Sequence, residues 1–105
     1  MSEDNPPRGR HVLVDLSGYV SHVDDDGEWM LQQIRAAVAA SPAREVHSHV
    51  EAFDGQSSPR GFAAVVLIDE SHVTAHCYSE EGLLAIDSFS CGQCDPQSIV
   101  DHLLG

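Results

Sequence analysis

The sequence predicts an α+β fold, a two-layer sandwich in which two helices lie on one face of a largely antiparallel sheet. Three observations lead to it. Apolar or alternating runs of strand length recur along the 105 residues. Two other stretches carry apolar residues at helical spacing. The segments follow the order β-α-β-β-β-β-α, and turns too short for crossover helices join the last three strands into an antiparallel meander.

The first half of the chain supplies two strands and one helix. Residues 10–20 and 45–53 alternate apolar with polar side chains and are predicted to be strands. Residues 24–26 are three aspartates, which cap a helix over residues 28–40 because acidic side chains accept from its free amides and oppose its dipole. Ser41-Pro42 ends this helix, and its apolar stripe consists of Trp29, Leu31, Ile34, Ala37 and Val38.

The second half supplies the meander and a last helix. Residues 62–68 are a continuous apolar run, typical of a covered strand, and residues 73–78 and 83–89 form the next two strands. Polar turns at 69–72 and 79–82 separate them. A helix begins at Asp95-Pro96, and its inward side chains are expected to be Ile99, Val100, Leu103 and Leu104.

Composition limits the class of protein. We expect one domain over residues 9–105 and a disordered tail over residues 1–8. The formal net charge of −12 argues against nucleic acid or an anionic membrane as a partner and suits a cationic substrate, although a lysine-free acidic composition is equally what salt adaptation would favour. Three cysteines, no secretory leader and no run of membrane-spanning length predict a reducing, cytoplasmic setting.

One set of residues resembles a known family. Its members are Glu70-Ser71-His72, then His76 and Glu80, then Asp87-Ser88-Phe89-Ser90-Cys91-Gly92. This set is similar to the core of the prokaryotic S-adenosylmethionine decarboxylase proenzymes. The histidine five positions after the serine and the cysteine twenty positions after it match the family's spacing. Gly9-Arg10-His11 and Pro59-Arg60-Gly61 match as well, so the resemblance covers most of the chain from about residue 9.

The resemblance implies a pyruvoyl-dependent carboxy-lyase of polyamine and spermidine biosynthesis that decarboxylates S-adenosylmethionine. The proenzyme would cleave itself between Glu70 and Ser71, and Ser71 would become the pyruvoyl group that holds the substrate as a Schiff base. By the same resemblance His76 is the processing base and Cys91 the proton donor. Two protomers would pack as a homodimer with active sites near the interface, no metal is implied, and the substrate-binding residues would be Glu80, Tyr78 and Phe53.

The chemistry of these residues agrees with that expectation. Decarboxylation of an amino acid leaves a carbanion at Cα, which needs an electron sink. Pyridoxal phosphate is normally held by a lysine, and the chain has five arginines and no lysine. A pyruvoyl ketone needs no lysine, since it forms the imine directly with the substrate amine.

Self-cleavage sets a geometric condition on Ser71. A serine hydroxyl is a weak nucleophile, so it needs a base and a constrained turn that presents the carbonyl of Glu70. Strict alternation would place Ser71 and His76 on opposite faces of a strand. His76 therefore serves Ser71 only if the chain bends between them, and we expect the bend at residues 70–72.

Departures from the family pattern leave two alternatives open. The chain reads His76-Cys77-Tyr78-Ser79-Glu80 where the family commonly has His-Thr-Trp-Pro-Glu, and Ala63 replaces a serine that assists processing. A lost nucleoside pocket would favour the same chemistry on L-ornithine or L-arginine. Lost processing would leave a non-catalytic homologue that acts as a regulatory partner.

Two other chemistries use the same side chains. His72, His76, Cys91 and Cys94 are the residue types of a Cys2His2 zinc site, but on a strand the two histidines would stand about 13 Å apart. The Cys91-x-x-Cys94 pair before a helix also fits a thioredoxin-like redox role. We expect Cys94 to be structural.

Overall fold

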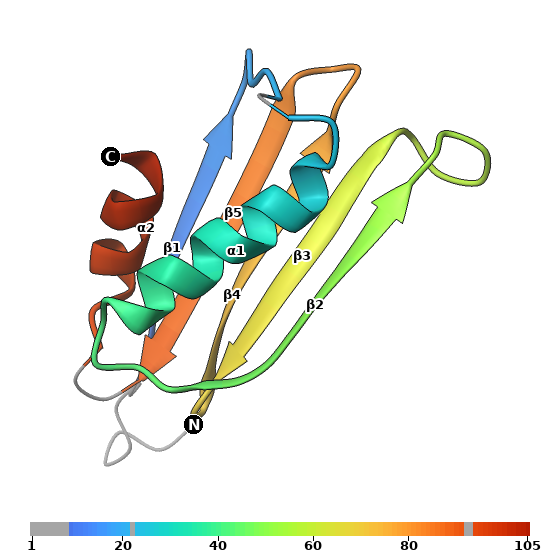
Figure 1. Ribbon diagram of the computed structural model, residues 1–105. Coiled ribbons are helices and arrows are strands. Elements are labelled where there is room, and N and C mark those ends of the chain that lie inside the picture. The colour runs from blue at the N-terminus through green and yellow to red at the C-terminus, as the bar shows by residue number, and fades with distance from the viewer. Residues whose placement is uncertain (1–8, 22, 92–93) are drawn as a thin grey trace, which may run out of the picture.

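The computed structural model describes residues 9–21, 23–91 and 94–105, and it confirms the predicted order of elements (Figure 1). The predicted tail over residues 1–8 lies outside the described residues. The elements are β1 Gly9–Leu16, α1 Asp26–Ala39, β2 Glu45–Phe53, β3 Gly61–Ile68, β4 Ser71–Tyr78, β5 Leu83–Cys91 and α2 Pro96–Leu104.

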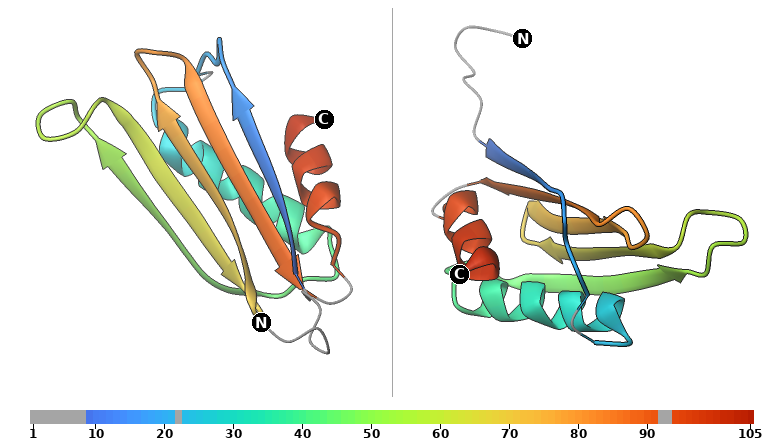
Figure 2. Two further views of the ribbon diagram at one scale, coloured as in Figure 1. Left: turned by 180° about the vertical axis from the view of Figure 1, so that it is seen from behind. Right: turned by 90° about the horizontal axis from the view of Figure 1, so that it is seen from above.

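The strands form one sheet in the order β1-β5-β4-β3-β2, and every neighbouring pair is antiparallel. Both helices lie on the same face of this sheet, and α1 runs across it (Figures 1 and 2). The other face, which we call the open face, carries no element of the described chain (Figure 2). The predicted α+β sandwich is therefore confirmed.

The core lies between the helices and the sheet. Alternate residues of β3, β4 and β5 point into it, among them Val66, Val73 and Ala75, whose exposure is zero. Helix α1 closes the core with Ile34, which is also fully buried. Met30 is buried at its N-terminal end, and Trp29, predicted for the apolar stripe, is partly buried and packs against the core.

Two expectations about the ends of elements are wrong. The first strand ends at Leu16 instead of residue 20, because Gly18 takes a left-handed φ of 72° and turns the chain. Leu104 is 50% exposed instead of inward-facing. Leu103 and Leu104, in the last turn of α2, line a hollow of about 200 Å³ between the helices and the sheet, so Leu104 faces open space there. No helix of the described residues is long and apolar enough to span a membrane.

Gly61 is required where β3 begins. It pairs with Tyr78, and a Cβ at Gly61 would stand 1.8 Å from the carbonyl oxygen of Cys77. We expect Gly61→Ala to lower the free energy of unfolding by about 2–3 kcal/mol, because the clash is with backbone that can yield only by separating the strands. Urea denaturation measures this.

The matched control is Gly18→Ala. A Cβ added at Gly18 would have no atom within 4 Å, but the residue holds φ at 72°, so the loss there is strain alone, about 1 kcal/mol. If both variants lost the same free energy of unfolding, the close contact of Gly61 with the Cys77 carbonyl would not contribute to stability as proposed.

Candidate active site

The predicted cleavage site lies in a tight turn. Asp69 and Glu70 alone connect β3 to β4, since Ile68 already pairs with Ser71. Glu70 has φ of 60°, and it is the one non-glycine residue with positive φ in the described chain. A left-handed conformation costs such a residue roughly 1–2 kcal/mol. The constrained turn that the sequence predicts at the scissile bond is thus present, and Glu70 itself carries the strain.

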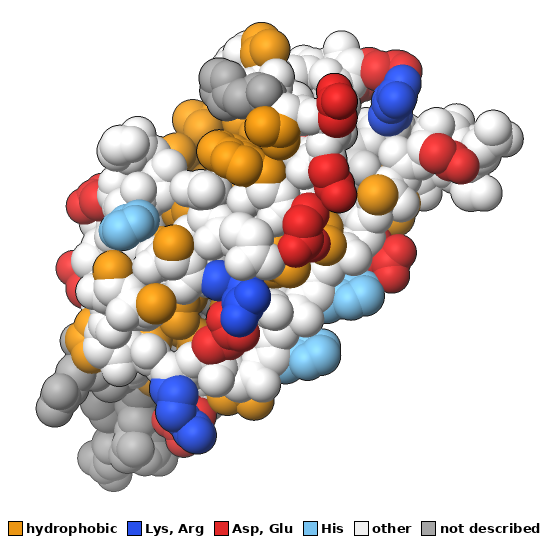
Figure 3. Space-filling model, in the orientation of Figure 1, with side chains coloured by type: hydrophobic (Ala, Val, Ile, Leu, Met, Phe, Trp, Pro, Cys, Tyr) orange, Lys and Arg blue, Asp and Glu red, His pale blue; other side chains and the backbone are white. Residues whose placement is uncertain are grey.

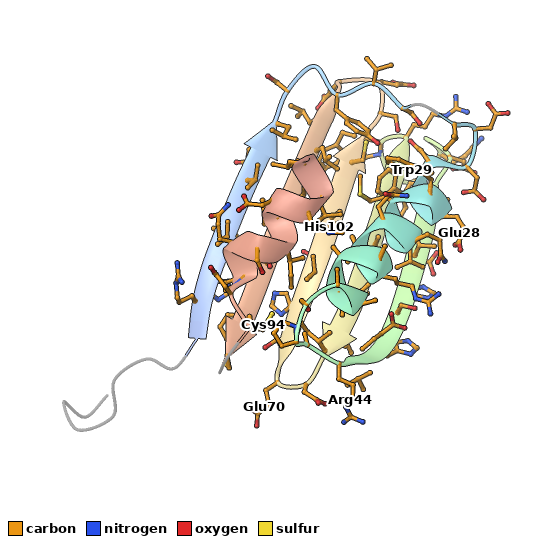
Figure 4. All side chains as sticks on the ribbon, turned by 60° about the vertical axis from the view of Figure 1, so that its left-hand side comes forward. Glu28, Trp29, Arg44, Glu70, Cys94 and His102 are labelled. Atoms are coloured by element: carbon orange, nitrogen blue, oxygen red, sulfur yellow. The ribbon has the colours of Figure 1, made fainter. Side chains whose placement is uncertain are left out.

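Ser71 is held beside Cys91. Its Oγ accepts a hydrogen bond from the backbone N–H of Cys91 at 3.0 Å. Both residues line a pocket of about 250 Å³ together with Arg44, Glu70 and Cys94. Figure 4 shows Arg44, Glu70 and Cys94 gathered at this end of the molecule. The serine, the predicted scissile peptide and the candidate proton donor therefore share one pocket.

A buried serine fixes the chain around the two thiols. Ser90 is 3% exposed, and its Oγ donates to the carbonyl oxygen of Cys94 at 2.8 Å and lies 3.4 Å from that of Cys91. Both cysteines are free and partly buried. Cys94 also packs against the core, in line with the structural role expected of it.

His76 lies far from Ser71. Strand β4 starts at Ser71 and stays in continuous register with β3 up to Tyr78, so the chain does not bend between the two residues as expected. The turn precedes Ser71 instead. Five residues of strand separate the two side chains by about 16 Å and place them on opposite faces. One protomer alone does not bring His76 to Ser71.

The expected substrate-binding residues gather around His76 instead. Phe53, Ala63, His76 and Tyr78 line a pocket of about 240 Å³ at the far end of β4 from Ser71. Phe53 and Tyr78 are 36% and 44% exposed, so aromatic surface is available for stacking. Glu80 is exposed in the turn that follows β4. The predicted site residues thus fall into two groups at opposite ends of the sheet.

A charged cluster that the sequence analysis did not predict lies on the open face. The carboxylate of Asp87 contacts His72 Nε2 at 2.9 Å and His11 Nδ1 at 3.1 Å. Desolvation alone would raise the pKa of Asp87, but the hydrogen bonds from His72 and His11 outweigh it and lower that pKa. The ring of Phe89 lies against both histidines, with centroids 4.4 Å from His11 and 5.6 Å from His72.

Gly9 makes room for this cluster. A Cβ on Gly9 would stand 2.3 Å from the Phe89 ring and 3.2 Å from Cys91 Sγ. Because β1 pairs with β5 in the register Gly9↔Cys91, the start of the chain is packed directly against the candidate proton donor.

The described residues contain no group of three or more histidine, cysteine or acidic side chains placed to hold a metal ion. His72 and His76 stand four residues apart on one face of a straight strand, which separates them by about 13 Å.

The comparison with known proteins covers the same part of the chain. The family model for S-adenosylmethionine decarboxylase matches residues 10–104. The chain belongs to this family. An S-adenosylmethionine decarboxylase proenzyme from Brevibacillus brevis is 35% identical over 97 residues, which are 91% of this chain and 70% of the relative. A proenzyme from Caldanaerobacter subterraneus is 40% identical over 87 residues, 80% of this chain and 64% of the relative.

Solved structures agree. The crystal structure of the adenosylmethionine decarboxylase from Aquifex aeolicus superposes with a TM-score of 0.75 at 28% identity, covering 91% of this chain and 77% of that one. The relatives are named proenzymes, and the family forms its pyruvoyl group from an internal serine after self-cleavage. In this chain Ser71 directly follows the strained Glu70.

The family motif contained the missed cluster without revealing it. His11, His72 and Asp87 all belong to the segments that resemble the family. Alternation along each strand indicates that His72 and Asp87 point away from the buried side of the sheet. Their contact depends on the register of β1, β5 and β4, in which His11 and His72 both lie opposite Phe89. Strands β1 and β5 lie far apart in the sequence, so no turn between them indicates the register that brings His11 to Asp87.

Proposed function

We propose that this chain is a self-processing, pyruvoyl-dependent decarboxylase that acts on S-adenosylmethionine in polyamine biosynthesis in the cytoplasm. The observation that carries the proposal is the left-handed Glu70 directly before Ser71, in the pocket that also contains Cys91. Strain at a scissile bond is useful only if the bond is to be cleaved, and a turn with a glycine at this position would be free of it.

Cleavage starts when Ser71 Oγ attacks the carbonyl carbon of Glu70. The C–N bond breaks as the C–O bond forms, so the peptide becomes an ester and the turn is released from its strained conformation. Elimination then leaves the carboxylate of Glu70 on the first chain and dehydroalanine at residue 71. Water converts dehydroalanine to pyruvoyl, and the nitrogen leaves as ammonia. The backbone N–H of Cys91, 3.0 Å from Ser71 Oγ, orients the hydroxyl before the attack.

The pyruvoyl group supplies the electron sink for the bond that breaks when carbon dioxide leaves. The chain's own residues do the remaining work. The Cys91 thiol donates a proton to the substrate Cα, for which its place in the Ser71 pocket suits it. Phe53 and Tyr78 provide the aromatic faces on which an adenine stacks, and Glu80 accepts from ribose hydroxyls.

The separation of His76 from Ser71 favours a homodimer in which each site uses both chains. The open face exposes large apolar side chains that monomers rarely leave bare, namely Leu13, Phe53, Leu67, Tyr78 and Leu83. Two copies packed through this face, with their strands running in opposite directions, would set the His76 end of one chain over the Ser71 end of the other. Ser71 is the first residue of β4 and points to the helix side, so His76 reaches its partner's serine around the end of that strand, and Phe53 and Tyr78 reach the partner's substrate.

The first prediction concerns processing. Purified protein should consist of two chains, residues 1–70 and residues 71–105, the second beginning with pyruvoyl. Ser71→Ala should remain whole. Denaturing mass spectrometry decides, and a wild type that stays intact after long incubation would favour the non-catalytic homologue, consistent with Ala63 in place of the family's serine.

A second prediction concerns the shared site. His76→Ala alone should stay uncleaved, and so should Ser71→Ala alone. Co-expressed, the two should form mixed dimers in which the His76→Ala chain is cleaved, because its intact Ser71 meets the partner's His76. Differently tagged chains show which one is cut. If neither chain were cleaved, the proposal that each site uses residues of both chains would be contradicted.

The third prediction separates the two partly buried thiols. Cys91→Ala should process normally but lose turnover by on the order of 10² to 10⁴-fold, the usual contribution of a positioned general acid. Cys94→Ala is the control and should lose much less, because its contacts are with the core. Equal losses would instead favour a thiol pair.

The fourth prediction concerns the substrate. Carbon dioxide should be released from S-adenosylmethionine and not from L-ornithine or L-arginine assayed beside it. Release from an amino acid alone would keep the pyruvoyl chemistry and overturn the nucleoside substrate. The distal cation would then pair with Glu80, with Asp15, or with residues 24–26. Those three aspartates line a hollow of about 420 Å³ where acidic side chains gather around the N-terminal end of α1 (Figure 3).

A further inference from the structure

Arg44 holds Asp69, the residue before Glu70, in place by a bidentate ion pair. Its Nε donates to Asp69 Oδ2 and its Nη2 to Asp69 Oδ1, each at 2.9 Å, which is the bidentate geometry of a strong arginine–carboxylate pair. The backbone adds a third contact, since the N–H of Asp69 donates to the carbonyl oxygen of Arg44 at 3.2 Å. Asp69 is therefore fixed at both its side chain and its main chain by one residue of the α1–β2 connection.

The turn that Asp69 opens needs such a support. Two-residue hairpin turns are favoured when φ is positive at the first central residue or at both, because that twist matches the strands. Here the described backbone has positive φ at the second residue, Glu70, and not at Asp69. Neither residue is glycine. Left to itself this hairpin would relax toward a more favourable turn, and the strain at the peptide bond before Ser71 would be lost.

The ion pair contributes little to the free energy of folding. The side chains of Arg44 and Asp69 are 78% and 52% exposed, and pairs in such positions contribute close to nothing to folding. Their hydrogen bonds lower the pKa of the Asp69 carboxyl and raise that of Arg44, so both are charged at neutral pH. Figure 4 shows Arg44 and Glu70 at the same end of the molecule. A well-formed contact with little effect on stability is better explained by the position that it imposes.

We propose that Arg44 is a positioning residue for self-cleavage: by clamping Asp69 it holds Glu70 in the left-handed conformation and presents the Glu70 carbonyl to Ser71. The inference rests on the proposed self-cleavage and deepens it. Arg44 touches neither the scissile bond nor the attacking hydroxyl in this role, so it acts on the rate of cleavage through the turn.

The test follows the appearance of the two chains after a pulse of cell-free synthesis. Arg44→Gln and Asp69→Asn should each slow cleavage about tenfold or more, since small misplacements of reacting atoms carry losses of that size. The double exchange Arg44→Asp with Asp69→Arg should restore most of the rate, because it rebuilds the pair in reverse. The matched control is Arg35→Gln, which breaks the neighbouring Arg35–Glu45 pair of 2.9 Å and should cleave at the wild-type rate.

Melting temperatures in a Ser71→Ala background show whether the effect is positional. Adding Arg44→Gln there should leave the melting temperature within about a degree of its parent, as expected for an exposed pair. A slowed cleavage accompanied by a clearly lower melting temperature would overturn the positioning role. Arg44→Gln cleaving as fast as Arg35→Gln would overturn the clamp and leave self-cleavage standing. A wild type that stays whole would overturn self-cleavage, and the clamp with it.

Discussion

The hydrogen-bond ladder of β4 is the constraint on which the site depends. This strand is paired with β3 on one side and β5 on the other, so its direction and its faces are fixed along its whole length. Alternation then assigns Val73, Ala75 and Cys77 to the helix side and His72, His76 and Tyr78 to the open face. A side chain cannot change faces without a register slip that would also expose the core. Whatever chemistry the chain performs must be arranged within those positions.

This constraint explains why one side of the sheet has a core and the other has reactive groups. The helix side is filled by aliphatic residues with near-zero exposure. The open face mixes apolar side chains with imidazoles, five of the chain's seven histidines, and with the carboxylate of Asp87 between two of them. Such a mixture suits neither a buried core nor a fully solvated surface. It suits a surface that is covered part of the time or by a polar partner.

The sequence was sufficient for the architecture and for the identity of the site residues. Strand β2 has the bounds predicted for residues 45–53 because both ends carry turn signals, and the meander follows from its short polar turns. It was not sufficient for distances. The sequence predicts that His76 serves Ser71 only if the chain bends between them, and the continuously paired strand shows that it does not bend there. The contact of His11 with Asp87 depends on register between strands far apart in sequence, and the exposure of Leu104 depends on the hollow that α2 leaves against the sheet. Tertiary geometry of this kind leaves no local signal.

The position of the turn determines how the two fragments remain associated after cleavage. A break at Glu70 divides the chain so that the first fragment keeps β1, α1, β2 and β3, and the second keeps β4, β5 and α2. In the sheet the second fragment's strands lie between β1 and β3 of the first, so neither fragment contains a complete layer and β1 is bonded only to the other fragment's β5. The intact chain can assemble this sheet in a single-molecule reaction, whereas the cut protein could do so only by two fragments finding each other. Folding must therefore precede cleavage. Before cleavage the chain can unfold and refold reversibly. After cleavage it is a complex of two fragments, and its lifetime is set by the rate at which the fragments dissociate.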